Sequence, residues 1–229
     1  TLYYMRRYVR FMQELLAAEA GPVELSIEVG EWLADTSVAL AGLRPLLGKV
    51  TISPAERWRS MQELGLAASH YRLSVYRDQP FSGKTERPLE QVTDLLEDTL
   101  AAIDHSIRSN RRENGTYSAY NLLDLRAGEV GVDPLYLMLE GQVAALSSGA
   151  IAPQATAALV ESLFDSDIYR ADQRSFMLYP DRPLPGFLEK NRIPAGGVEE
   201  VVLLRRMIAA NDDRIVSRDA DGCYRFNAD

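Results

Sequence analysis

Cysteine and histidine are scarce in this 229-residue sequence, which has one cysteine, Cys223, and two histidines, His70 and His105. A single cysteine cannot form an intrachain disulfide, which fits a reducing, cytoplasmic compartment. No cluster has the spacing of metal ligands, so we expect no metal and no cofactor. No apolar run approaches the roughly 18 residues of a membrane span, so we expect no membrane partner.

Basic residues are also few relative to acidic ones. The chain has 25 lysines and arginines against 33 aspartates and glutamates, so its formal net charge is −8. A field of this sign disfavours phosphate backbones, and we expect no nucleic-acid partner. Hydrophobic residues make up 46% of the chain, which is ample for a folded core.

Gly83-Lys84-Thr85 matches the end of a phosphate-binding loop motif, but the rest of the motif is missing. The motif requires a glycine where this sequence has Asp78, and a strand and a helix on either side. We interpret residues 78–87 as a loop.

What the first half does contain is helical periodicity. Apolar spacing predicts helices over 2–20, from Val23 or Ser26 to Leu43, over 54–76 and over 89–110. Ser53, Pro54 and Glu56 form a capping box at the start of the third helix. These helices form antiparallel hairpins, as in a bundle or part of an α/α toroid-like array.

The second half is more mixed. Residues 111–131 indicate a strand, a hairpin or a loop, and helices are predicted from Asp133-Pro134 to Leu146, from Pro153 to Phe164 and over 198–211. Residues 169–194 form a long irregular, proline-rich loop, and Asp221-Gly222 predicts a turn in a short C-terminal β-hairpin. The predicted fold is mainly α, with a helical region (1–110) and a mixed region (111–229) that share one core. The sequence starts inside a helical pattern and stops just after a strand-like segment, so we expect a fragment of a larger protein.

The stretch 169–191 is the first candidate site. Long loops rich in aromatic residues are usually functional, and prolines restrict their backbone. Tyrosines beside Asp, Arg and Asn suit a sugar, because rings cover C–H surfaces and forked polar groups bind vicinal hydroxyls. The alternative is that the charges pair within the loop, Asp172 with Arg170 or Arg174 and Asp181 with Arg182.

A second candidate site combines residues 112–121 with Glu140-Gly141-Gln142. A Glu and a Gln in an apolar helix are costly to bury without partners, and a carboxyl in such surroundings can serve as a general acid. Gly141 costs about 1 kcal/mol against alanine in a helix, which indicates a close approach of another segment. The alternative places Glu140 on the solvated side.

Three segments, 115–123, 137–144 and 179–185, resemble a region of very large bacterial proteins that are described as glycoside-phosphorylase-like or glycoside-hydrolase-like. The resemblance covers residues 115–229. It implies a piece of a larger protein with helical-toroid catalytic regions and a carbohydrate as ligand, and it assigns no catalytic residue.

Together these observations predict a helical domain of a carbohydrate-active protein that binds or cleaves a glycoside. Cleavage needs two carboxyls, for which we name Glu140 as the acid and Asp172 or Asp181 as its partner. The candidate ligand-binding residues are Tyr117, Tyr120, Asn121, Arg174, Tyr179, Arg182 and Glu189. The alternative is a non-catalytic helical module that packs against other domains of its parent chain.

Overall fold

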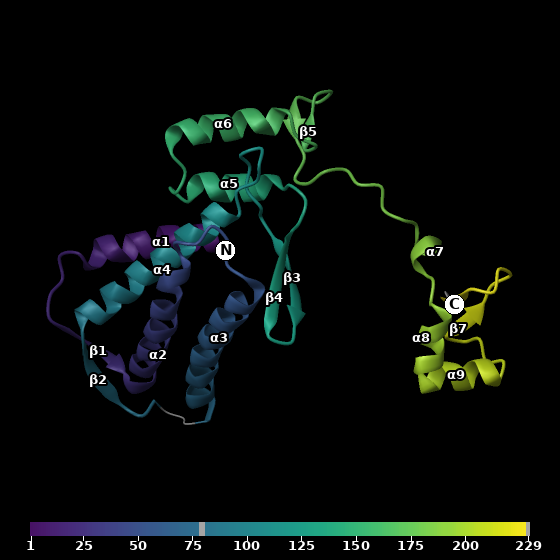
Figure 1. Ribbon diagram of the computed structural model, residues 1–229, viewed down its shortest axis with the longest axis horizontal. Coiled ribbons are helices and arrows are strands. Elements are labelled where there is room, and N and C mark those ends of the chain that lie inside the picture. The colour runs from purple at the N-terminus through teal and green to yellow at the C-terminus, as the bar shows by residue number, and fades with distance from the viewer. Residues whose placement is uncertain (78–80, 228–229) are drawn as a thin grey trace. The chain divides into compact units, whose positions relative to one another are not determined.

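The computed structural model describes residues 1–77 and 81–227. The chain divides into two compact units, residues 1–181 and residues 182–229. Helices dominate both, and the strands form only two-stranded antiparallel sheets (Figure 1). The mainly α fold predicted from the sequence is thereby confirmed, including the hairpin near the C-terminus.

Four long helices build the lower part of the first unit in Figure 1. They are α1 (Leu2–Leu16), α2 (Ile27–Leu43), α3 (Pro54–Arg77) and α4 (Leu89–Ser109), and a 3-10 turn, η1 (Arg44–Leu46), follows α2. The predicted capping box is present, because Ser53 Oγ accepts from the Glu56 amide and Glu56 accepts from the Ser53 amide. Lys49 and these Ser53 contacts lower the pKa of Glu56 to about 2.

A small sheet between helices was not expected. Strand β1 (Pro22–Ser26) pairs antiparallel with β2 (Lys84–Pro88), with Glu24 opposite Glu86. The predicted loop is therefore wrong for residues 84–87, while 78–80 lie outside the described residues. These strands lie about sixty positions apart in the chain, so no local sequence pattern predicts their pairing.

The upper part of the first unit consists of the hairpin β3 (Asn121–Arg126) and β4 (Glu129–Pro134), the helices α5 (Leu139–Ser147) and α6 (Pro153–Phe164), and the hairpin β5 (Tyr169–Arg170) and β6 (Ser175–Phe176). A helix starting at Asp133-Pro134 was wrong, because both residues pair with β3 and the helix begins at Leu139. The stretch expected to be irregular contains the β5–β6 hairpin.

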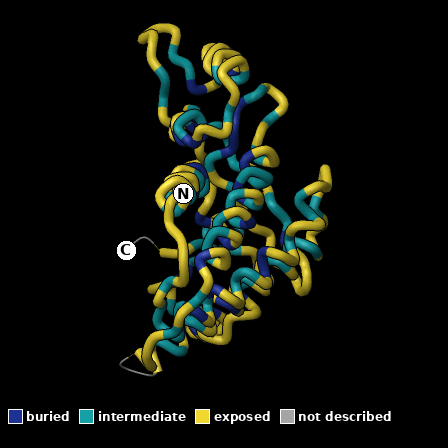
Figure 2. The backbone as a smooth tube through the Cα atoms, turned by 90° about the vertical axis from the view of Figure 1, so that its left-hand side faces the viewer, coloured by how far each residue is buried: buried dark blue, intermediate teal, exposed yellow. Residues whose placement is uncertain are grey.

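One apolar core holds the first unit together across residue 110. It joins Tyr3 and Val9 of α1, Ile103 and Ile107 of α4, and residues from the later segments, among them Tyr117, Ala145, Leu159, Leu163 and Ile168. Figure 2 colours the buried residues dark blue. A second cluster, centred on Leu33, Leu40 and Leu95, packs α2 against α4.

The second unit has its own small core of Val198, Leu204 and Val216. It contains α7 (Phe187–Lys190), α8 (Ala195–Glu200), α9 (Val202–Ala209), β7 (Val216–Arg218) and β8 (Tyr224–Phe226). The single helix predicted over 198–211 is wrong, because Val201 adopts an extended conformation between α8 and α9.

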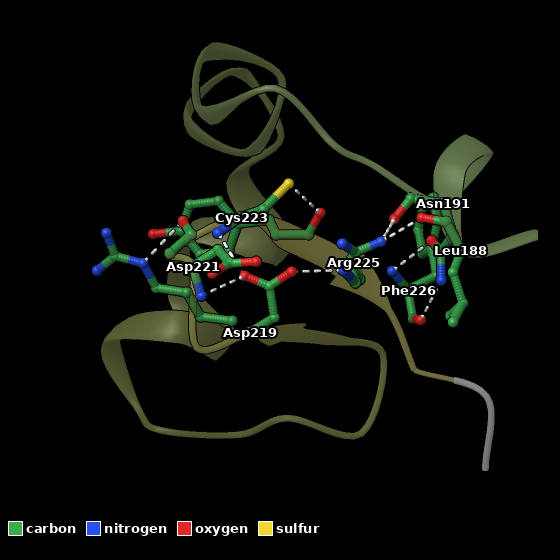
Figure 3. Close-up of polar contacts among 10 residues, drawn as sticks. Leu188, Asn191, Asp219, Asp221, Cys223, Arg225 and Phe226 are labelled. Carbon is green, nitrogen blue, oxygen red and sulfur yellow. Dashed lines mark hydrogen bonds and ion pairs between the residues drawn. The ribbon is translucent and has the colours of Figure 1, made fainter.

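Polar contacts tie the C-terminal hairpin to α7 (Figure 3). Asp219 accepts from the Cys223 amide at 2.8 Å and from Arg225 Nε at 2.5 Å. Arg225 also donates to the Leu188 carbonyl, and Asn191 exchanges two hydrogen bonds with the backbone of Phe226. The turn and the short helix are therefore fixed by buried or half-buried side chains.

Candidate functional site

Gln142 fixes the position of residues 112–121, part of the second candidate site. It is fully buried, its Oε1 accepts from the Tyr117 amide at 2.8 Å, and its Nε2 donates to the Tyr117 carbonyl at 2.7 Å and the Met138 carbonyl at 3.0 Å. The buried amide is thus satisfied at both ends, as burial of such a group requires. Tyr117, a predicted ligand residue, lies in the core with its ring edge-to-face against Tyr3.

Gly141 permits the close approach expected from the sequence. A Cβ added at this position would lie 2.7 Å from the Cβ of Ala119 and 3.0 Å from its Cα. Helix α5 and residues 117–120 therefore touch backbone to backbone, which a larger residue would prevent.

This contact brings Tyr120 and Glu140 together. Both are exposed, and the hydrogen bond and negative charge of Glu140 raise the pKa of the Tyr120 phenol. They line a shallow pocket of about 150 Å³ with Tyr3 and Tyr4 of α1. That volume falls below the ~300 Å³ at which ligand pockets usually start.

A larger cavity of about 610 Å³ is lined in part by the neighbouring residues Ser118 and Asn121. Its walls come from residues 50–57, the end of α4, the following loop and β4. The lining residues are Val50, Thr51, Ile52, Arg57, His105, Ser106, Ser109, Asn110, Arg111, Arg112, Glu113, Ser118, Asn121, Val132 and Pro134. The volume is in the range of sites for small organic ligands.

Two asparagines connect this cavity to the end of α4. Asn110 Nδ2 donates to the Ser106 carbonyl at 2.9 Å, and Asn121 Nδ2 donates to Asn110 Oδ1 at 2.8 Å. The Ser106 carbonyl can only accept, so both amides have a single consistent orientation. Asn121 Oδ1 is consequently left without a hydrogen-bond partner, as is Arg112 Nε.

Three arginines give the cavity a positive character within an acidic chain. Arg57 donates to the Val130 carbonyl at 3.1 Å, and Arg112 donates to the Leu135 carbonyl. Neither these two nor Arg111 forms an ion pair with a carboxylate in the described part of the chain. Glu113 is the one acidic residue among the described lining residues, so the cavity favours ligands rich in acceptors.

The other candidates are spread over the two units. Asp172 forms a bidentate ion pair with Arg170, at 2.9 and 2.8 Å, as the alternative interpretation of the loop predicted. The hydrogen bonds from Arg170 also lower the pKa of the Asp172 carboxyl. Arg174 occupies the left-handed region (φ 50°) in the turn between β5 and β6.

Residues near the end of the first unit approach α5. Leu139 donates its amide to the Leu178 carbonyl at 2.8 Å, and the rings of Tyr179 and Tyr136 meet edge-to-face at 6.5 Å. Asp181 ends this unit. Arg182 and Glu189 belong to the second unit, where Glu189 accepts from the Gly186 amide at 2.7 Å and caps α7.

The cavity residues Arg57, Arg111 and Ser109 had not been singled out from the sequence. No signal could have found Arg57, because α3 meets β4 only in the tertiary structure. Over residues 1–77 and 81–227, no three His, Cys, Asp or Glu side chains gather as metal ligands would. Within the same residues, no helix combines the length and apolar character needed to cross a membrane.

The chain is thus a mainly helical protein with a small, separately packed C-terminal unit. Residues 184–229, almost the whole of that unit, match the family described as GH149 phosphorylase insertion domain 2. The match supports the expected glycoside-phosphorylase-like region in this part of the chain. A search of curated proteins finds no match to the chain.

Proposed function

We propose that the chain is part of a carbohydrate-active protein and binds a saccharide in the 610 Å³ cavity. The cavity is the observation that carries the proposal, because its volume suits one or two sugar rings and its lining mixes two kinds of surface. Val50, Ile52, Val132 and Pro134 offer apolar surface to C–H groups. Guanidinium, amide and hydroxyl groups supply hydrogen bonds to sugar hydroxyls.

The proposal is that the chain binds the saccharide without cleaving its glycosidic bond. Hydrolysis or phosphorolysis at two carboxyls requires both to flank the bond, and retaining or inverting geometry is set by their separation. Among the described lining residues, Glu113 is the only carboxylate. Glu140, Asp172 and Asp181 do not line this cavity, so the proposal gives them no catalytic task.

Arg111 offers the sharpest test, because its side chain lines the cavity, is exposed and has no hydrogen-bond partner within the described residues. Isothermal titration with glucose, mannose and glucose disaccharides of different linkage should find binding to the 229-residue chain. Arg111→Ala should weaken it by roughly tenfold or more, as expected when a charged group loses a hydrogen bond to the ligand. Arg108→Ala, an exposed arginine outside the lining, is the matched control. Absence of binding across the panel, or equal affinity of the Arg111 variant, would refute the proposal.

A second candidate function is a module that packs against other domains of a larger protein. The second unit favours it, since Leu184, Phe187, Leu188 and Leu203 are all exposed there. Exposed apolar groups of this kind mark interaction surfaces. Amide exchange over 184–188 should then be slower in a longer polypeptide that includes these residues than in the 229-residue chain, and equal rates would contradict the idea.

A further inference from the structure

Helix α1 has two apolar faces. Tyr3 and Val9 are buried in the core, whereas Tyr4, Tyr8, Phe11 and Leu15 remain 52–60% exposed on another side. We call these four residues the α1 stripe. Figure 2 shows the exposed side of this helix beside the N-terminus.

The spacing of the α1 stripe is four, three and four residues, which aligns its side chains in one row along the helix. The helix packs on α4 and α5 with its other face. From Tyr4 to Leu15 the row has a length of about 17 Å. A continuous apolar row of this length is unusual on an isolated surface and is typical of an interaction site.

The stripe is symmetric about its centre. Tyr4 and Leu15 are equally far from a point between Val9 and Arg10, and so are Tyr8 and Phe11. An antiparallel copy of the same helix therefore places Tyr4 against Leu15 of the second copy and Tyr8 against its Phe11. Self-complementarity of this kind is what a two-fold interface requires.

Charged residues beside the α1 stripe are also arranged as the two-fold symmetric, antiparallel pair requires. Arg7 and Glu14 are exposed and form no ion pair in the described part of the chain. Seven positions separate them along one helix, or about 10 Å, so they cannot pair with each other. In the antiparallel arrangement, Arg7 of each copy lies beside Glu14 of the other, and Met5 and Met12 meet along the opposite edge.

We propose that the α1 stripe binds a second copy of this chain, forming an antiparallel, two-fold symmetric pair of α1 helices. A single pair of four-turn helices buries less than the roughly 800 Å² per partner of a standard interface, so the dimer is weak, with a Kd on the order of tens of micromolar. No α1 residue lines the saccharide cavity, so this proposal does not depend on the proposed function.

Sedimentation equilibrium of the 229-residue chain between about 5 and 500 µM, in the presence of a reductant, measures this dimer directly. The expected result is a reversible monomer–dimer equilibrium. Phe11→Asp should leave only monomer, because it places a charge in the middle of the row. Leu122→Asp, at a comparably exposed leucine of β3, should leave the equilibrium unchanged.

Charge reversal tests the antiparallel register. Arg7→Glu and Glu14→Arg should each raise the dimer Kd about tenfold, since each turns two attractions into two repulsions. The double variant should return to within about twofold of the original, because both pairs reform with exchanged signs. Arg10→Glu changes the charge equally but lies about 130° around the helix from the stripe, and should have little effect.

A chain that stays monomeric at every concentration overturns the proposal. So does a dimer that persists in the Phe11 variant, because it must use another surface. A dimer whose Kd responds equally to the Arg7 and Arg10 substitutions overturns the antiparallel register. Unchanged thermal unfolding of each variant ensures that the losses concern association rather than folding.

Discussion

Replacement of Gly141 by alanine measures how tightly α5 packs against residues 117–120. Alanine in a helix is ordinarily favoured over glycine by about 1 kcal/mol. Here the added Cβ would lie 2.7 Å from one side-chain atom and 3.0 Å from the backbone of Ala119, so the two segments must separate. Overpacking of this kind costs about 1–3 kcal/mol, so after the gain in helix propensity we expect a net destabilisation of about 0–2 kcal/mol.

Gly65 in α3 is the matched control, because a Cβ at that position meets no atom within 4 Å. Gly65→Ala should stabilise the first unit by about 1 kcal/mol through helix propensity alone. Urea unfolding followed by tryptophan fluorescence is suited to the comparison, since Trp32 and Trp58 both lie in the first unit. An increase in stability for Gly141→Ala, equal to that of the control, would refute the close-packing argument.

Three further predictions concern buried or paired polar groups. Gln142→Leu leaves the Tyr117 amide and carbonyl buried without partners and should cost about 2–5 kcal/mol in urea unfolding; a cost under 1 kcal/mol would contradict this. Burial raises the pKa of Tyr3 to about 12, so its contribution to stability is complete below pH 10 and is lost as the pH rises toward 12. Tyr3→Phe should reduce this alkaline loss, measured by unfolding at pH 9 and pH 11. Arg225 lowers the pKa of Asp219, whose stabilising effect is therefore present above about pH 3.8 and disappears as the pH falls through its folded value. Asp219→Ala removes the acceptor of the Cys223 amide and should accelerate its exchange at pH 7 relative to the wild type, and equal rates would count against that hydrogen bond.

Local sequence signals predicted most of the helices. The capping box at Ser53 and Glu56 fixes the start of α3, and glycine, proline and apolar spacing fix most other ends within a few residues. Two exceptions depend on strand pairing. Strand β2 pairs with β1, about sixty positions away, and the end of β4 pairs with β3 of the same hairpin, so residues 84–87 and 133–134 adopt extended structure despite loop or helix signals.

The candidate site was only partly predictable for the same reason. Residues 112–121 and Glu140 stood out by composition, and Gly141 indicated a close approach that the structure contains. Their assigned roles in ligand binding and catalysis stay predictions. The division of the chain at residue 181, which separates Arg182 and Glu189 from the other candidates, has no signature in the local sequence.

Sequence alone determined where most of the helices form, because hydrophobic periodicity and end-capping act over a few residues. Through the resemblance of residues 115–123, 137–144 and 179–185, it also indicated a glycoside-phosphorylase-like region, which the family match supports for residues 184–229. Tertiary structure decided which polar groups share a cavity. Arg57, Asn110 and Asn121 come from three separate elements, and only the packing of α3, α4 and the β3–β4 hairpin brings their side chains to one place.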